Sequence, residues 1–335
     1  MTTTDDSDDL STEVPQELTV EARAHGWRVD HYLSRLYPNY SRALFQRAIQ
    51  DDRVLVNGLV IKSSRRLRVN DRISVLLPEQ PDGDLQPENI PIEIVYEDEY
   101  IAVINKAADV VTHPGKANFT GTLAAAVQYH FDQLSDVAGQ LRPGIVHRLD
   151  RDTTGVIVIA KDNTVHNRLT RQFEQRVVKK EYRAIVRGGP PAESDYVRTH
   201  VKVHPKVREK MIICGADDNG KEAVTFYRVL KRFPGFSYVQ LLPETGRTHQ
   251  LRVHMLHLKC PIIADKLYAG HASVSTDDIK TGETSQAGNV TLIERQALHA
   301  HRLTLRHPVT EAIMEFEAPL PEDMQRTLDF LETTV

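Results

Sequence analysis

The sequence predicts an α+β protein made of a small N-terminal module and a larger C-terminal domain. Its 335 residues are enough for two domains. Helical and strand-like hydrophobic patterns both occur along the chain. Residues 78–91 contain four prolines and one glycine among acidic residues, which indicates an extended linker between the two parts.

The elements before this linker form a compact pattern. Residues 1–19 contain six acidic residues and no Lys or Arg, and we expect them to be a disordered tail. Residues 20–77 predict two amphipathic helices, the first ended by Pro38 and the second capped by Ser41. A hairpin with an Asn57-Gly58 turn and a strand at 72–76 follow, which completes a small α/β module.

The larger domain, which we place at residues 92–325, mixes strands and helices. Strand patterns occur at 94–96, 101–104, 179–186, 224–230, 238–242, 298–303 and 312–316. Helices are predicted at 122–134, from Asp162 or Asn163 onward, and from residue 246 towards Leu258. Residues 270–296 lack periodicity, and we expect a long loop there.

One charged connection stands out in the larger domain. Residues 144–155 read Gly-Ile-Val-His-Arg-Leu-Asp-Arg-Asp-Thr-Thr-Gly and precede an apolar run at 156–160, which predicts a strand, a tight connection and a second strand. Five ionisable side chains lie between His147 and Asp152. Because unpaired buried charge is costly, such a cluster beside a core strand is a candidate site. The alternative is a turn whose Asp and Thr side chains only cap backbone amides.

The charge is segregated along the chain, although the formal net charge is −4. Residues 20–77 carry eleven Lys or Arg against five acidic residues, and residues 141–210 carry sixteen against eight. Residues 78–100 carry eight acidic residues and no Lys or Arg. Two basic blocks of this kind favour a polyanionic partner, and we expect that partner to be RNA.

Composition excludes several other classes. No apolar run has the length of a membrane span, and the acidic N-terminus is unlike a signal peptide. The two cysteines lie far apart, so neither a disulfide framework nor a cysteine metal site is indicated. We therefore expect a cytoplasmic, monomeric protein without membrane association.

The N-terminal module resembles the RNA-binding module named after ribosomal small-subunit protein four. The resemblance rests on Arg28-Val29-Asp30-His31-Tyr32-Leu33, Ser41-Arg42, Val54-Leu55-Val56-Asn57-Gly58 and Asn70-Asp71-Arg72-Ile73. Modules of this type grip RNA phosphates with arginines, which provides affinity more than sequence selectivity. It implies that Arg28, Arg42, Arg47 and Arg53 contact RNA.

The larger domain resembles the RluA-type RNA pseudouridine synthases, which isomerise uridine to pseudouridine. The motifs, in order, are Leu141-Arg142-Pro143-Gly144, His147-Arg148-Leu149-Asp150, Lys180-Glu181-Tyr182-Arg183-Ala184, the stretch from Gly246 to His254 that reads Gly-Arg-Thr-His-Gln-Leu-Arg-Val-His, Ala264-Asp265-Lys266-Leu267-Tyr268, and Leu298-His299-Ala300. This resemblance implies a mixed, largely antiparallel sheet flanked by helices. It also implies an isomerase that needs neither cofactor nor metal, because no electrons or phosphoryl groups are transferred.

The same resemblance implies roles for individual residues. Asp150 is the catalytic carboxylate, acting as a nucleophile or as a stabiliser of cationic sugar, and Arg252 is its ion-pair partner. Tyr182 offers a ring for the flipped uracil. Substrate contacts are assigned to Arg148, which fills the vacated space, and to Arg247, Leu251 and His147.

One departure from the family pattern lies at the expected approach to the site. The family usually has Asn-Lys-Pro-x-Gly, whereas this chain has Asn105-Lys106-Ala107-Ala108-Asp109 before His113-Pro114. This change leaves the substrate contacts of that loop open.

Three functional hypotheses follow. The first is a pseudouridine synthase that modifies large-subunit ribosomal RNA, with transfer RNA as an alternative substrate. The second is a non-catalytic RNA-binding or ribosome-assembly factor. The third is a metal-dependent RNA hydrolase that uses Asp150 and Asp152. Arg148 and Arg151 argue against the third, since their charges compete with a metal ion. The spacing of His249, His254 and His257 is not that of a helical zinc site.

Overall fold

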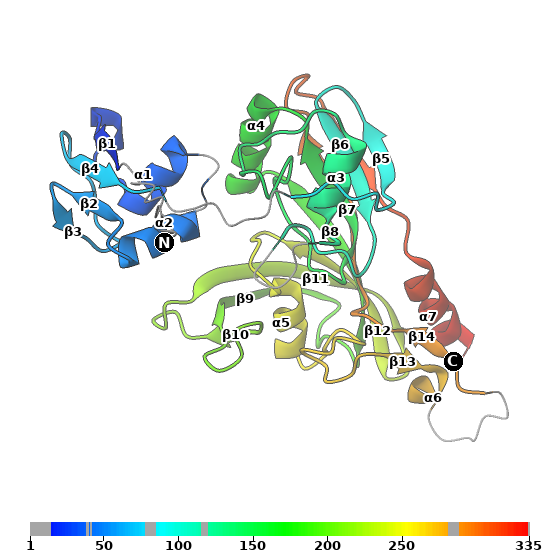
Figure 1. The fold of residues 1–335 in the computed structure, drawn as a ribbon. Helices are drawn as coiled ribbons and strands as arrows, with labels where there is room; N and C mark the ends of the chain where they lie inside the picture. Colours follow the sequence, from blue (N-terminus) through cyan, green and yellow to red (C-terminus); the bar gives the residue numbers. More distant parts are fainter. Residues whose placement is uncertain are drawn as a thin grey trace, which may run out of the picture. The chain divides into compact units, whose positions relative to one another are not determined.

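The computed structural model divides the chain into two compact units (Figure 1). One unit comprises Met1–Asp84 with Asp136–Gln140, and the other comprises Leu85–Ser135 with Leu141–Val335. The structure describes residues 15–37, 40, 42–77, 85–114, 120–280 and 288–333.

The first unit packs two helices against a four-stranded antiparallel sheet. Its helices are α1 (Val29–Leu36) and α2 (Arg42–Gln50), preceded by a 3₁₀ turn at Ala22–Ala24. The strands β1 (Gln16–Thr19), β2 (Val54–Val56), β3 (Leu59–Val60) and β4 (Arg72–Val75) are arranged in the order β1-β4-β2-β3. The core contains Leu33, Phe45, Ile49, Val54 and Ile73, all 2% exposed or less. The expected helices and hairpin are therefore present, while the cap at Ser41 lies outside the described residues.

Two boundaries at the ends of this unit need correction. The tail was expected to extend to residue 19, but Gln16–Thr19 forms strand β1, which pairs with β4 along its whole length. The predicted linker 78–91 also ends too late, because Leu85 is buried in a core of the second unit together with Ile104 and Ile157. Residues 1–14 and 78–84 lie outside the described residues.

The second unit is organised around a ten-stranded sheet. Its strands are β5 (Glu93–Glu97), β6 (Ile101–Lys106), β7 (Thr154–Ala160), β8 (Lys179–Arg187), β9 (Ser194–Val203), β10 (Met211–Cys214), β11 (Lys221–Phe233), β12 (Phe236–Pro243), β15 (Leu298–Arg306) and β16 (Ile313–Glu317). The order is β10-β9-β11-β12-β8-β15-β7-β6-β5, with β16 paired to β15. Among these pairs only β15 and β7 run parallel. The mixed, largely antiparallel sheet is thus confirmed.

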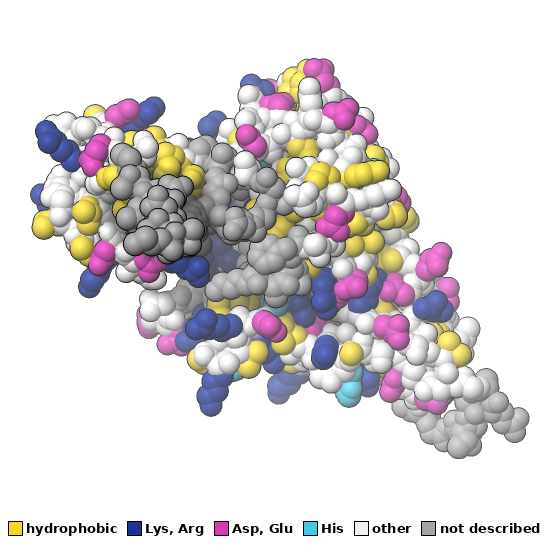
Figure 2. Space-filling model, viewed as in Figure 1, with side chains coloured by type: hydrophobic (Ala, Val, Ile, Leu, Met, Phe, Trp, Pro, Cys, Tyr) yellow, Lys and Arg dark blue, Asp and Glu magenta, His cyan; other side chains and the backbone are white. Residues whose placement is uncertain are grey.

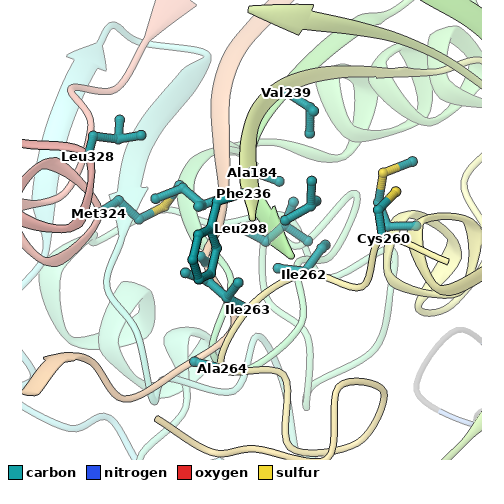
Figure 3. Packing of buried hydrophobic residues seen from close by; sticks show 14 of the residues in the cluster. Ala184, Phe236, Val239, Cys260, Ile262, Ile263, Ala264, Leu298, Met324 and Leu328 are labelled. Carbon is teal, nitrogen blue, oxygen red and sulfur yellow. The ribbon is translucent and has the colours of Figure 1, made fainter. Parts of the chain in front are cut away.

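Helices and short segments cover this sheet. They are α3 (Leu123–His130), α4 (Asn163–Glu174), α5 (Gln250–His257), α6 (Thr276–Ile279) and α7 (Glu322–Thr333), with the small pair β13 (Val274–Ser275) and β14 (Thr291–Ile293). Figure 3 shows Met324 and Leu328 of α7 beside Phe236 and Leu298, which belong to two strands of the sheet. Within the described residues, no helix combines the length and the apolar character needed to cross a bilayer.

Several predicted elements differ from the structure. The helix expected at 122–134 ends at His130, and the expected loop 270–296 contains β13, α6 and β14. The first strand expected in the charged connection reduces to an isolated bridge between Ile145 and Ile159. Helix α7 continues beyond the expected domain end at 325.

Candidate active site

A cavity of about 460 Å³ brings together the predicted catalytic residues. Its walls come from the connection before β7, from β8, and from the turn that leads into α5. Asp150, Tyr182, Arg252, Arg148, Arg247, Leu251 and His147 all line it. Residues more than 100 positions apart in the sequence therefore converge on one site.

The centre of the site is an ion-pair network around Asp150. Arg252 donates from Nη1 to Asp150 Oδ2 at 3.0 Å. Its Nε and Nη2 donate to the two carboxylate oxygens of Asp265 at 2.7 and 2.8 Å. Asp265 is fully buried and Arg252 is 7% exposed. Burial alone would lower the pKa of Arg252, but Asp265 and Asp150 raise it, so the guanidinium stays charged beside Asp150.

His249 approaches the same oxygen of Asp150 from a strained turn. Its backbone is left-handed, with φ of 53°, and its Nε2 lies 3.8 Å from Asp150 Oδ2. The Nδ1 atom lies 3.0 Å from the hydroxyl of Tyr268. Burial lowers the pKa of His249 even though Asp150 opposes this, so the ring is neutral at pH 7. Both His249 and Arg252 thus approach Oδ2, and among the described residues none donates a hydrogen bond to Oδ1.

The backbone around Asp150 is held from two sides. The hydroxyl of Thr112 donates to the carbonyl of Leu149 at 2.8 Å. The ammonium of Lys106 donates to the carbonyl of Arg151 at 2.8 Å, and also to the carbonyls of Ala107 and Val110. These contacts explain why a short connection can present one carboxylate to the cavity.

Tyr182 forms part of the cavity wall beside Asp150. Its ring packs against buried residues of two hydrophobic clusters while it lines the cavity. Burial and the charge of Asp150 raise the pKa of its phenol, so the hydroxyl is protonated at neutral pH. A neutral aromatic wall suits an uncharged base such as uracil.

The other expected substrate residues have different environments. Arg148 is exposed, and Leu251 is 7% exposed. Arg247 is anchored by a hydrogen bond of 2.9 Å from Nε to the carbonyl of Glu222. His147 stacks on Phe173, and its Nε2 accepts the backbone N–H of Val158 at 3.0 Å. Burial lowers the pKa of His147 to about 3, so the ring is neutral and already engaged by the backbone.

The arginines assigned to RNA binding in the first unit are not equivalent. Arg28 and Arg42 form ion pairs with Asp30, at 2.9 and 3.1 Å. Asp30 is fully buried, and its pKa falls to about 2 because these hydrogen bonds outweigh the effect of burial. Arg47 is exposed on α2, and Arg53 donates to the carbonyl of Leu77.

Three functional contacts were missed from the sequence. Asp265 and Tyr268 lie in a quoted family motif but had no role assigned, and His249 was weighed as a metal ligand and interpreted instead as a polar or RNA-facing histidine. The loop at 105–109 is also clarified, since Asp109 adopts a left-handed φ of 59° where the family usually has glycine. Aspartate tolerates this conformation better than most residues, so the turn is kept without glycine.

Asp152 does not share the cavity with Asp150. It lines an adjoining cavity of about 870 Å³, together with Arg151, Arg252 and Arg295. In the described part of the chain, no group of three or more His, Cys, Asp and Glu side chains is arranged to hold a metal ion. Arg252 lines both cavities and forms an ion pair with Asp150, and its positive charge disfavours a metal ion between Asp150 and Asp152.

Figure 2 shows Lys and Arg side chains over the part of the second unit where β9, β10 and α5 lie in Figure 1, with acidic side chains near α7. The five Lys or Arg residues that line the cavity around Asp150 outnumber its three carboxylates. The surroundings of the site are therefore suited to a polyanion.

Comparison with known proteins places these features in a family. The sequence model of the RNA pseudouridylate synthase family matches residues 100–257, and that of the S4 domain matches residues 27–73. An uncharacterized RNA pseudouridine synthase of Chlorobaculum parvum is 42% identical over 92% of this chain and 95% of its own length. A ribosomal large subunit pseudouridine synthase D of Pasteurella multocida is 39% identical, over 92% of each chain.

Solved structures agree with this likeness. The human RNA Pseudouridylate Synthase Domain Containing 4 is 27% identical, with a TM-score of 0.52 over 72% of this chain and 93% of its own. The human RNA Pseudouridylate Synthase Domain Containing 1 is 25% identical, with a TM-score of 0.50 over 76% and 98%.

Proposed function

This chain belongs to the RNA pseudouridylate synthase family, and from that premise we propose that it modifies uridine in large-subunit ribosomal RNA, with Asp150 as the attacking carboxylate. The observation that carries the proposal is the Asp150–Arg252 ion pair of 3.0 Å at the wall of a cavity that also contains Tyr182. The name of the relative from Pasteurella multocida supports ribosomal RNA as the substrate.

In the proposed reaction, an Asp150 oxygen attacks C1′ of a flipped uridine while the C1′–N1 bond breaks and its electron pair stays on the base. The uracil rotates against Tyr182. Its C5 then displaces Asp150 from C1′, the C5 proton is lost, and N1 takes up a proton. Because Arg252 and His249 lie beside Oδ2, Oδ1 is the oxygen left for attack. The permanent charge of Arg252 stabilises the carboxylate each time it is released.

The test is release of tritium from C5-labelled uridine in an RNA stem-loop, measured in EDTA. We expect release without chain cleavage by the natural protein, and complete loss of release in Asp150→Asn. The matched control is Asp152→Asn, which removes a neighbouring carboxylate outside the cavity and should retain most of the turnover. Release by Asp150→Asn would refute the assignment, while cleavage that EDTA abolishes would favour the metal-dependent hydrolase.

The substrate is tested separately by mapping pseudouridines in cells that lack the gene. Loss of sites confined to large-subunit ribosomal RNA is expected. Loss confined to transfer RNA would overturn the substrate but leave the chemistry intact. The non-catalytic alternative predicts no loss in either RNA.

A further inference from the structure

Lys180 is a cation of the catalytic cavity that the proposed reaction does not use. It lies on β8, two residues before Tyr182, and alternate residues of a strand face the same side. Both side chains line the cavity, whereas the neighbouring Lys179 is exposed and does not. The Nζ atom lies beside the turn into α5, because a Cβ added at Gly246 would be 3.9 Å from it.

The ammonium of Lys180 has no partner charge. Among the described residues, no carboxylate lies within 4.0 Å of Nζ, and the two exposed glutamates of the cavity, Glu174 and Glu244, form no ion pair with it. Burial and the nearby charge of Arg176 lower the pKa of Lys180. The surroundings of Lys180 therefore disfavour the positive charge of its ammonium and provide no carboxylate to neutralise it.

Other buried cations of this unit are compensated. Arg252 and Arg295 each form ion pairs with buried or half-buried carboxylates, and Lys106 donates to three carbonyls. A half-buried ammonium without such partners costs free energy in the unliganded protein. This cost is offset when an anion of the substrate enters the cavity.

We propose that Lys180, with Arg176 beside it, binds a phosphodiester of the RNA backbone next to the target uridine. This inference rests on the proposed function of the cavity. Residues two apart on a strand are about 7 Å apart, which is close to the reach from a base across its sugar to the adjoining phosphate. A phosphate on Lys180 would thus hold the strand while the flipped uracil lies against Tyr182.

The experiment measures RNA binding in the Asp150→Asn background, so that the RNA is not converted during the measurement. Lys180→Met is compared with Lys179→Met over a range of salt concentrations, with a stem-loop that the natural protein modifies. We expect Lys180→Met to weaken binding about tenfold and to reduce the salt slope by about 0.7 to 0.9, as expected for one lost phosphate contact. Lys179→Met should change the slope less, and Lys180→Arg should keep it.

A single phosphate is then identified with stem-loops that carry one uncharged methylphosphonate. At the phosphate bound by Lys180, the methylphosphonate should lower the RNA affinity of the Asp150→Asn protein. It should not lower further the affinity of the protein that also carries Lys180→Met. Equal salt slopes for the two Met variants would overturn the proposal. The proposal would also be overturned if, at every phosphate flanking the uridine, the methylphosphonate and Lys180→Met lowered RNA affinity additively. Additive effects would indicate only long-range electrostatic attraction.

Folding and function are separated by two further readouts. Because Lys180 has no partner to lose, Lys180→Met should unfold at a temperature equal to or above that of the parent protein. Failure of the proposed function would appear as tritium release by Asp150→Asn itself. Failure of the Lys180 proposal would appear instead as equal salt slopes for the two Met variants while Asp150→Asn releases no tritium.

Discussion

Lys106 is the residue whose charge state couples the site to pH. Its side chain is 1% exposed, and burial lowers its pKa from 10.5 to about 7 despite the attraction of Asp152. The three carbonyls that it contacts belong to the loop at 107–110 and to the connection that carries Asp150. The ammonium therefore joins two segments of the site at an electrostatic cost.

This cost predicts a pH-dependent stability. Between about pH 7 and 10.5 the unfolded chain binds a proton at Lys106 that the folded chain increasingly lacks, so the free energy of unfolding gains from this residue as pH rises. The gain is at most about 1.4 kcal/mol per pH unit. It is measured as the difference in urea unfolding between the natural protein and Lys106→Met across this range. A difference that stays constant with pH would contradict the prediction.

Among individual residues, the sequence predicted those that belong to a recognisable motif and were given a role by the resemblance. Asp150, Tyr182 and Arg252 converge in one cavity, as the resemblance implied. Asp265 escaped assignment because its role is to orient Arg252, and a buried carboxylate that acts through another side chain has no pattern of its own in the sequence. The tertiary contact of His249 with Tyr268 is equally invisible in local spacing.

At the scale of elements, β7 and β15 form the parallel pair that places the Asp150 connection beside β8. His299 pairs with Thr154 and Ala300 pairs with Gly155. Gly155 has a φ of 112°, and a Cβ there would overlap the backbone carbonyl of Ala300. The absence of a side chain at Gly155 thus permits the close approach of two buried strands.

Gly155→Ala should therefore destabilise the protein more than its unusual φ alone requires. Gly188→Ala is the matched control, because Gly188 has a φ of 70° but no atom within 4 Å of an added Cβ. The control should lose about 1 to 2 kcal/mol, from the left-handed conformation alone. Gly155→Ala should lose at least about 4 kcal/mol or fail to fold, as expected of a backbone collision in the core. Equal losses in chemical denaturation would show that strand approach is not the constraint.

Helices and strands with clear local sequence signals were predicted, and those with weak signals were missed. Asp162 caps α4 as expected, accepting hydrogen bonds from the N–H groups of Thr164 and Val165. Strands β9 and β10 were missed because many of their residues are polar or half-exposed, so that hydrophobic alternation is weak. The end of α3 was also misplaced, because tertiary packing can override helix propensity in determining where a helix ends.

At the scale of the whole molecule, both units carry arginine side chains, and these arginines have different environments. In the second unit, Arg252 forms an ion pair with Asp150. In the first unit, Arg28 and Arg42 are ordered by Asp30, whereas the exposed side chain of Arg47 forms no ion pair or hydrogen bond among the described residues. Composition predicted this basic character, but the separation into paired and unpaired arginines required the structure.

Arg47→Gln is consequently the cleanest probe of the first unit. It should reduce affinity for RNA and lower the salt slope by about 0.7 to 0.9, because one phosphate contact is lost. At saturating RNA the rate of tritium release should be unchanged, since Arg47 belongs to a different unit from Asp150. Arg28→Gln would confound the measurement, because it removes a partner from the fully buried Asp30 and should also lower stability. A fall in the saturated rate with Arg47→Gln would show instead that the first unit takes part in positioning the uridine.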